Sequence, residues 1–360
     1  MKRHKICKII LAILSVFLCV AFYELIGICI TYKKQPAVSD ATIKETQNIM
    51  SVVGRENTER AVIIEKNSQA LLERVRLIQN AKNEIILSTF AFKSDESGKL
   101  ILGALHDAAD RGVHVRILVD GMESWIDMEG NPYFYGLSSH ENVEIKLYNK
   151  ANPLKPWKTM GRMHDKYLIA DGKIYILGGR NTYNYFLGDF PGHKNFDRDV
   201  LVVCDEPQKD NSVNQLWNYF ETIWEQEDCR YFHNSKKLAD RQSVKKAVLE
   251  LQEGYQQYFE VNKEKICDTD YADETFETEK ITLLSNPIHT QAKEPVVWYQ
   301  LGELMKNAKE RVKIHTPYII CNDMMYNTWE EIAQKVPDFS IMTNSVANNG
   351  NPFGAADYAK

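Results

Sequence analysis

The sequence lacks an excess of positive charge and lacks paired cysteines. Its 360 residues include 44 Lys and Arg against 49 Asp and Glu, a formal net charge of −5, so the chain is unlike proteins that bind nucleic acid through overall basic charge. None of its seven cysteines forms a CxxC pair, which gives no support to a zinc site or a disulfide framework. With 44% hydrophobic and 26% charged residues, the composition is that of a globular protein and excludes a largely disordered chain.

One long apolar run stands near the N-terminus, at Ile9–Ile30. About 20 apolar residues in a helix span a hydrocarbon core of about 30 Å. Four Lys or Arg residues precede the run and two follow it, and the more positive end is expected on the cytoplasmic side. A cleaved signal peptide would have a shorter apolar core that ends in small residues, whereas residues 29–32 are Cys-Ile-Thr-Tyr. We therefore predict a retained single-pass anchor in the cell membrane, with the N-terminus cytoplasmic and the rest of the chain extracytoplasmic.

Helical and strand patterns alternate after a polar linker. Apolar residues recur at helical spacing in 68–80, and residues 84–92 form a continuous apolar strand pattern. Residues 98–110 are again helical, and residues 113–120 alternate as in a strand. This order predicts an α/β fold with a mixed or parallel sheet.

The start of this unit recurs later in the chain. The pattern LxxNAK occurs at 77–82 and at 304–309, an offset of 227 (304 − 77), and ILVD at 117–120 corresponds to IMTN at 341–344, an offset of 224 (341 − 117). Two matches in the same order favour an internal duplication. The patterns divide the chain into an N-terminal tip and anchor (1–34), a linker (35–60), a first domain (61–230), a solvated connector (231–280) and a partial second domain (281–360).

The segment Met163–Asn181, MHDKYLIADGKIYILGGRN, holds the residues with the clearest chemistry. His164 and Lys166 are two positions apart, which on a strand puts both side chains on one face. Residues 171–172, Asp-Gly, predict a tight turn between two strands. The glycines at 178–179 allow the backbone to approach a ligand closely. The segment therefore predicts a β-hairpin that presents His164 and Lys166 together.

This set of side chains suits phosphate chemistry. The imidazole of His164 can attack phosphorus or protonate a leaving oxygen. Lys166 and Asn181 can hold the non-bridging oxygens while charge develops, and Gly179 would allow close backbone approach. No metal or cofactor is required for this reaction, and the carboxylates of the chain show no ligand spacing.

The motif resembles the HKD motif of the phospholipase D superfamily. His164, Lys166 and Asp171 stand at its three named positions, and Asn181 matches the asparagine that follows. The resemblance implies that one histidine forms a phosphohistidine, that another acts as general acid, and that an alcohol or water then takes the phosphatidyl group. It implies catalytic roles for His164, Lys166 and Asp171, with His164 as the nucleophile, and phosphate binding by Lys166, Asn181 and Gly179. Of these, Asp171 is expected to support the turn and its hydrogen bonds rather than to react.

The surrounding segments look most like the cardiolipin synthase branch of this superfamily. ALHDAADRGVHVRILVDG is similar to its helix–strand leader, and FDRDVLVV to the strand beyond its first motif. The likeness covers roughly residues 61–225 and resumes at about 280–360. It implies a phospholipase D-like mixed sheet flanked by helices, with one complete repeat, the start of a second, and an N-terminal transmembrane helix. In this family an acidic side chain often orients the histidine, and Asp197 or Asp199 is the candidate here.

The chain departs from the family in having one HxK motif where the family pairs two. The repeat offset would place a second motif near position 391, beyond Lys360. Three interpretations follow: the sequence is truncated at its C-terminus, which we expect; the single motif pairs with that of a second subunit in a homodimer; or the chain is inactive.

These observations predict a phosphatidyltransferase of cardiolipin synthase type that acts on a phosphatidylglycerol-like lipid. The alternative is a phospholipase D, phosphodiesterase or nuclease of the same superfamily. The negative net charge does not favour nucleic acid. The local basic and aromatic candidates for a nucleic-acid site, which could equally bind anionic lipid headgroups, are Lys150, Lys155, Trp157, Lys158 and Arg162.

Overall fold

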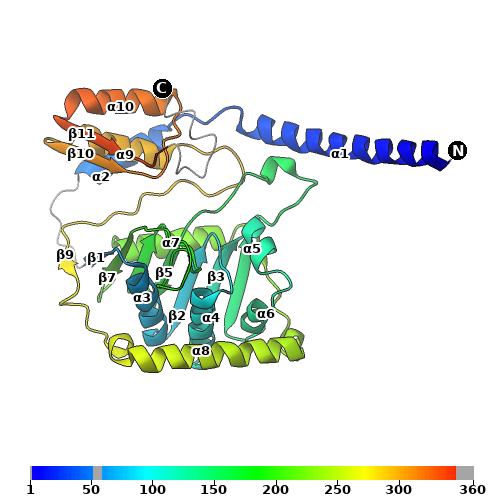
Figure 1. The fold of residues 1–360 in the computed structure, drawn as a ribbon. Helices are drawn as coiled ribbons and strands as arrows, with labels where there is room; N and C mark the ends of the chain where they lie inside the picture. Colours follow the sequence, from blue (N-terminus) through cyan, green and yellow to red (C-terminus); the bar gives the residue numbers. More distant parts are fainter. Residues whose placement is uncertain (1, 52–58, 346–360) are drawn as a thin grey trace. The chain divides into compact units, whose positions relative to one another are not determined.

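The computed structural model describes residues 2–51 and 59–345, and the chain forms two compact units (Figure 1). The larger unit holds the described parts of 1–33, 54–283 and 288–291, and the smaller unit holds those of 34–53, 284–287 and 292–360. Of the predicted linker, residues 52–58 lie outside the described residues, as do residues 346–360 of the predicted second domain.

A mixed β-sheet is the framework of the larger unit. Among the described residues it has nine strands, in the order β8-β4-β3-β2-β5-β6-β7-β1-β9. The central strands β2, β3 and β4 are parallel, and the others pair antiparallel with their neighbours. The strands are β1 (Arg60–Ile64), β2 (Glu84–Thr89), β3 (His114–Asp120), β4 (Val143–Tyr148), β5 (Tyr167–Ala170), β6 (Ile174–Gly178), β7 (Asp199–Val203), β8 (Cys229–Tyr231) and β9 (Phe276–Glu277).

Helices cover both faces of this sheet because successive strand residues point to opposite sides. Ile85 and Ile117 belong to the apolar core shared with α3 and α4, whereas Ile86 and Leu118 belong to the core shared with α7. The helices of the larger unit are α1 (Lys2–Tyr32), α3 (Asn67–Asn80), α4 (Glu96–Asp110), α5 (Gly121–Asp127), α6 (Pro132–Ser138), η1 (Pro156–Lys158), α7 (Ser212–Trp224), η2 (Lys236–Leu238) and α8 (Gln242–Cys267).

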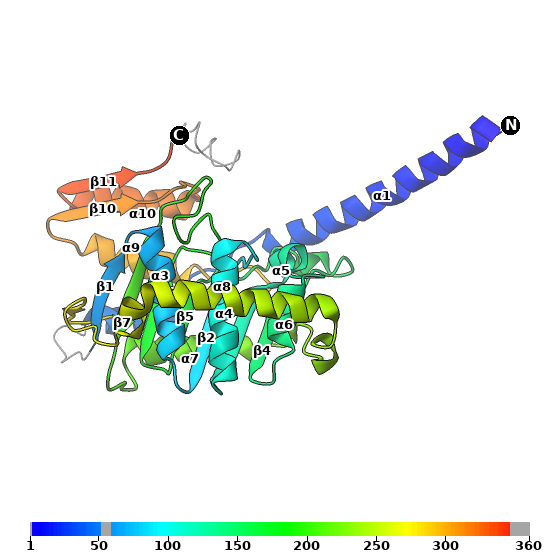
Figure 2. The same ribbon diagram turned by 60° about the horizontal axis from the view of Figure 1, so that its bottom comes forward.

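Helix α8 differs from the solvated connector that we expected at 231–280. It lies across α3, α4 and α6 and forms an outer layer over them (Figures 1 and 2). Its Val244, Leu251 and Tyr255 are buried. Their helical spacing produces an apolar stripe, and the polar residues between them face solvent. The stripe makes this segment part of the core of the larger unit.

The smaller unit repeats the beginning of the larger one. Its elements are α2 (Asp40–Ser51), α9 (Val296–Lys306), β10 (Arg311–His315), α10 (Asp323–Lys335) and β11 (Asp338–Met342). The order α9-β10-α10-β11 matches α3-β2-α4-β3, and both strand pairs are parallel. Arg311 of β10 pairs with Asp338, just as Glu84 pairs with His114, at offsets of 227 (311 − 84) and 224 (338 − 114). The offsets are those of the sequence repeat, so the structure agrees with a duplicated unit.

Helix α1 contains the predicted apolar run. Among the described residues it is the one helix long and apolar enough to cross a membrane, over Lys5–Tyr32, and that span is not buried within the protein. A helix of this length extends about 42 Å at 1.5 Å per residue. It is therefore longer than the roughly 30 Å hydrocarbon core of a bilayer.

Candidate active site

The predicted hairpin is present and consists of β5 and β6. The N–H of Lys173 donates to the carbonyl oxygen of Ala170 at 3.0 Å and closes a turn around Asp171 and Gly172. These two residues have φ angles of 52° and 62°, as a hairpin turn that matches the strand twist requires. Asp and Gly tolerate this left-handed backbone better than most residues do, which explains why the Asp-Gly pair marks the turn.

The carboxylate of Asp171 forms three hydrogen bonds at this end of the hairpin. It accepts backbone hydrogen bonds from Lys82 at 2.8 Å, Asn83 at 2.7 Å and Glu84 at 2.9 Å. It therefore fixes the loop between α3 and β2 to the hairpin turn. His164 precedes the opposite end of β5. These contacts are those of the turn-supporting role that we expected for Asp171.

His164 lies in the extended segment just before β5, which begins at Tyr167. The residue as a whole is exposed, but its ring packs edge-on against Phe90, with 4.5 Å between ring centroids, which removes part of the ring from water. Desolvation, followed by the positive charge of Lys166, lowers the pKa of His164 to about 4. The imidazole is therefore neutral near pH 7, and a neutral ring nitrogen has the free electron pair that a nucleophile needs.

Lys166 is buried beside this histidine, with 5% of its surface exposed. Its Nζ donates to the carbonyl oxygen of His164 at 2.6 Å and lies 5.2 Å from the centre of the Phe90 ring. Burial lowers the pKa of Lys166 to about 8, against the opposing effect of Asp165 and Asp197. The side chain therefore stays mainly protonated near pH 7, as a cation that receives phosphate oxygens must be.

Asn181 reaches the same edge of the sheet from the end of β6. Its side chain is buried, and its Oδ1 accepts the N–H of Ala91 at 3.2 Å. This bond orients the amide, and among the described residues its NH₂ group donates to none. Because β2 and β6 end where β5 begins, Asn181, His164 and Lys166 come from neighbouring strand ends.

Gly179 and Asp197 form a close pair beside this group. A Cβ atom on Gly179 would lie 2.1 Å from the Oδ2 of Asp197, so only glycine admits the carboxylate here. We expected Gly179 to let its backbone approach a ligand closely. In the structure, the group that lies close to Gly179 among the described residues is the carboxylate of Asp197. The negative charge of Asp197 also acts on Lys166, so Asp197 is the better placed of the two candidate carboxylates.

Asp199, the other candidate orienting carboxylate, is engaged in ion pairs with two arginines. Its side chain is buried, and its Oδ2 forms ion pairs with Arg74 at 2.9 Å and with Arg180 at 3.2 Å. These partners come from α3 and from the segment after β6. Arg180 is itself fully buried. Its guanidinium also donates to the carbonyl oxygen of Ile64, so its burial is compensated by polar partners. Asp199 therefore neutralises a buried arginine pair and makes no hydrogen bond to His164.

Sequence reasoning missed Asp120, which is 1% exposed at the end of β3. Its carboxylate accepts from the Arg162 guanidinium at 2.7 Å, from the Met163 N–H at 3.1 Å and from the Met122 N–H at 3.0 Å. It thereby fixes the backbone next to His164 and acts electrostatically on the imidazole. The available signal was its position: Asp120 ends β3, and the repeat offset of 224 aligns it with Asn344, which follows β11.

Known proteins resemble the part of the chain that carries this site. Residues 75–224 match the family model described as cardiolipin synthase, phospholipase D-like domain. The chain carries a phospholipase D superfamily domain. It is 27% identical over 320 residues to an uncharacterized protein of Helicobacter pylori, across 81% of this chain and 60% of that protein. It is 29% identical over 154 residues to cardiolipin synthase C of Escherichia coli, across 39% of this chain and 31% of that protein.

The fold of the phospholipase D-like domain recurs in a solved structure. Phosphatidylserine synthase of Haemophilus influenzae superposes with a TM-score of 0.56 and 14% sequence identity, over 86% of this chain and 67% of that protein. At this identity the likeness concerns the fold alone. The chain spans 60% of the length of the Helicobacter protein and about a third of that of the cardiolipin synthase.

Some of the basic residues that precede His164 are neutralised by carboxylates. Lys158 pairs with Asp228 at 2.5 Å, and Arg162 pairs with Asp120. Lys150 and Lys155 are exposed and form no ion pair with another described residue. Two of the four basic side chains in this cluster are thus paired with carboxylates.

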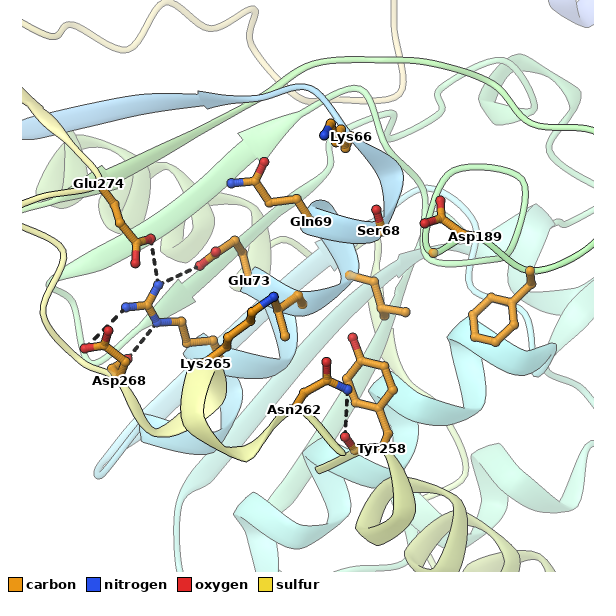
Figure 3. Close-up of a pocket in the computed structure, with 15 residues that line it drawn as sticks. Lys66, Ser68, Gln69, Glu73, Asp189, Tyr258, Asn262, Lys265, Asp268 and Glu274 are labelled. Carbon is orange, nitrogen blue, oxygen red and sulfur yellow. Dashed lines mark hydrogen bonds and ion pairs between the residues drawn. The ribbon is translucent and has the colours of Figure 1, made fainter. Parts of the chain in front are cut away.

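A cavity of about 640 Å³ elsewhere in the larger unit is lined at one end by an arginine and three carboxylates that pair with it. Glu73, Asp268 and Glu274 converge at one end of it (Figure 3). Arg76 lies between them, 3.5 Å from Glu73 and 2.8 Å from Glu274. No residue of the HxK motif lines this cavity. We assign these ion pairs a structural role, because they attach the chain that follows α8 to α3.

Proposed function

We propose that the protein is a phosphatidyltransferase of cardiolipin synthase type, acting on membrane phospholipid through a covalent intermediate on His164. The observation that carries this proposal is the position of His164 beside the buried Lys166, whose Nζ donates to the carbonyl oxygen of His164 at 2.6 Å. This pair combines a nucleophile with a cation that stabilises the negative charge developing on phosphate oxygens. The family match and the cardiolipin synthase relative support the same reaction class.

In the first step a ring nitrogen of His164 attacks phosphorus, and a P–N bond forms as the P–O bond to the leaving alcohol breaks. The leaving oxygen takes a proton from a general acid, which the family resemblance assigns to a histidine of a second motif. In the second step an alcohol of another lipid attacks phosphorus, gives up its proton to that same group, and releases neutral His164. Water in place of the alcohol would make the reaction a hydrolysis.

Lys166 and Asn181 are proposed to hold the non-bridging oxygens through both steps. Lys166 brings a charge held against the carbonyl oxygen of His164, and Asn181 brings an amide oriented by Ala91. Asp197 is proposed as the carboxylate that balances the charge of Lys166, since it is packed against Gly179. The general acid would come from a second motif, which a homodimer could supply.

Helix α1 supports a membrane location for this reaction, because both substrates of a phosphatidyl transfer are bilayer lipids. We propose a single-pass anchor with a cytoplasmic N-terminus and an extracytoplasmic catalytic domain, as the excess of basic residues before the apolar run favours. Protease added outside sealed cells or spheroplasts should cut the catalytic domain. Protection from external protease, with cleavage after lysis, would reverse the orientation.

The activity is tested with the protein in vesicles of phosphatidylglycerol. Cardiolipin and free glycerol should appear in equal amounts, and His164→Ala should abolish both while the protein stays folded. His114→Ala is the matched control, because His114 lies at the start of β3 and pairs with Glu144; it should keep full activity. Phosphatidic acid in place of cardiolipin would show hydrolysis. DNA cleavage without any lipid product would overturn the proposal.

A further inference from the structure

We propose that residues 150–160, here called the juxtamembrane loop, are a second membrane-contacting element that lies in the headgroup region of an anionic bilayer beside α1. This inference rests on the membrane attachment proposed above and adds a surface to it. The loop joins β4 to the segment that carries His164. Its contact with the bilayer would set the distance between the nucleophile and the lipid phosphates.

The first observation is the exposure of large apolar side chains. Leu154 is 76% exposed, Met160 55% and Trp157 43%, all within the eleven residues of the juxtamembrane loop. Single exposed apolar residues are ordinary on a protein surface, but neighbouring ones in one short loop indicate an interaction site. Pro156 between them is buried, so the loop has a fixed base from which these side chains project.

The second observation is that this loop packs directly on the apolar helix. The hydroxyl of Tyr23 donates to the carbonyl oxygen of Leu154 at 3.0 Å. A Cβ atom on Gly27 would lie 2.5 Å from the Cγ of Pro156, so helix and loop are in contact at the glycine. Both α1 residues fall within the span Lys5–Tyr32 that is apolar enough to cross a membrane. The loop is therefore beside the C-terminal part of that span.

The length of α1 gives the depth of the loop. The apolar span of about 42 Å exceeds a hydrocarbon core of about 30 Å, so its last turns extend into the headgroup region when its N-terminal end is at the opposite interface. Trp and Tyr are the residues that prefer this region. Trp157 lies next to Gly27 in the last part of this span, and Tyr32 belongs to the last turn of α1. The apolar side chains of the juxtamembrane loop would then replace water contacts by contacts with lipid.

Charge indicates which lipid surface fits. Lys150 and Lys155 flank Leu154, are exposed, and form no ion pair with another described residue. Lys158 is different because it pairs with Asp228. Two exposed cations around an apolar tip, of which Lys150 also acts electrostatically on Glu129, match a surface of anionic phosphates. An anionic bilayer therefore fits the loop better than an apolar protein groove does.

The loop is mechanically connected to the nucleophile. The side-chain amide of Asn149 donates to the carbonyl oxygens of Lys158 and Gly161, both at 2.7 Å, and closes the loop at its base. The next residues are fixed by Asp120, which accepts from the Met163 N–H, and His164 follows at once. A bilayer contact at Leu154 and Trp157 would thus be transmitted to His164 through a short, hydrogen-bonded segment.

Tryptophan quenching tests the contact without relying on activity. The full chain is reconstituted in phosphatidylglycerol vesicles that contain lipid brominated near the headgroup end of the acyl chain. The contribution of Trp157 is the difference between the parent and Trp157→Phe, and we expect at least half of it to be quenched. Trp217→Phe is the matched control: Trp217 donates to Glu84, at the other end of β2, and its contribution should be unchanged. An unquenched Trp157 in a vesicle-bound protein would overturn the inference.

A loop variant separates this inference from the proposed function. Leu154→Ser, Trp157→Ser and Met160→Ser together should leave the protein anchored through α1 and lower its turnover of vesicle lipid about tenfold. Cleavage of a water-soluble aryl phosphodiester should be unchanged, because these residues do not touch His164. Equal turnover of vesicle lipid by parent and variant would count against the loop. A parent without activity on either substrate would sink the proposed function and leave the quenching result to decide the inference.

Discussion

The Nζ of Lys166 lies 2.6 Å from the carbonyl oxygen of His164, so the backbone of the nucleophile holds the cation of the same motif. The lysine is nearly fully buried, and its hydrogen bond fixes a side chain that is otherwise flexible. The positive charge in turn helps to keep the imidazole neutral. Two residues separated by one position thus supply a neutral nucleophile and an adjacent cation at the same pH.

The pH dependence of activity should follow from these two groups. With a pKa of about 4, His164 is deprotonated and nucleophilic above that pH, and with a pKa of about 8, Lys166 loses its charge above that pH. We expect kcat/KM on a soluble phosphodiester to rise near pH 4 and to fall near pH 8. In Lys166→Arg, any remaining activity should lack the fall near pH 8, because arginine stays charged. A fall near pH 8 that persists in this variant would assign it to another group.

Replacing Lys166 by methionine should make the protein inactive and more stable. The lowered pKa means that the folded state holds the Lys166 proton less tightly than the unfolded state does, so this group makes stability rise with pH between about 8 and 10.5. Below that window its desolvation is a cost, and removing it should raise the free energy of unfolding by about 1–3 kcal/mol at pH 7. Urea unfolding at pH 7 and pH 10 measures this. A variant less stable at pH 7 would show that the bond to His164 outweighs burial.

Asp171→Ala should destabilise the protein without removing its chemistry. Three backbone N–H groups lose a charged acceptor. Position 171 also has a positive φ, which alanine tolerates less well than aspartate does. The expected loss is about 2–4 kcal/mol in the free energy of unfolding. Asp171→Asn should lose less, since Asn tolerates this backbone and keeps one acceptor oxygen. At temperatures where each variant is folded, kcat should stay within about threefold of the parent; a far larger loss would restore a catalytic role.

The parts of the site that could be predicted are those encoded by neighbouring residues. The HxK spacing, the Asp-Gly turn and the repeat at 77–82 are local patterns, and each is present in the structure. Asp120 and Phe90 were missed because their approach to His164 depends on how β2 and β3 pair with the hairpin. The spacing of residues along the sequence does not show how close these side chains come to His164. The packing of α8 was missed because an apolar stripe at helical spacing does not show which element covers it, and the acidic run that follows the helix indicated a solvated connector.

Asp199→Asn and Asp197→Asn should fail in opposite ways. Asp199 is the counter-ion of the buried Arg74 and Arg180, so its neutralisation leaves two uncompensated charges and should cost about 3–5 kcal/mol of stability. Asp197 is partly exposed and acts on Lys166, so its neutralisation should leave stability nearly unchanged and lower kcat. Thermal melting and turnover on both variants give the comparison. A stable Asp199→Asn variant with lost activity would return Asp199 to the list of orienting candidates.

Gly179→Ala should lower activity because the added methyl group occupies the place of the Asp197 carboxylate. The new Cβ would lie 2.1 Å from Oδ2, and the carboxylate would have to move away from its position near Lys166. We expect a kcat loss of about tenfold or more, as follows from a displaced charge in a preorganised site. Gly172→Ala is the control: its φ of 62° costs about 1 kcal/mol of stability, but a Cβ there meets no atom within 4 Å. If both alanine variants lost activity equally, the effect would lie in the hairpin as a whole, and the contact between Gly179 and Asp197 would have no separate role.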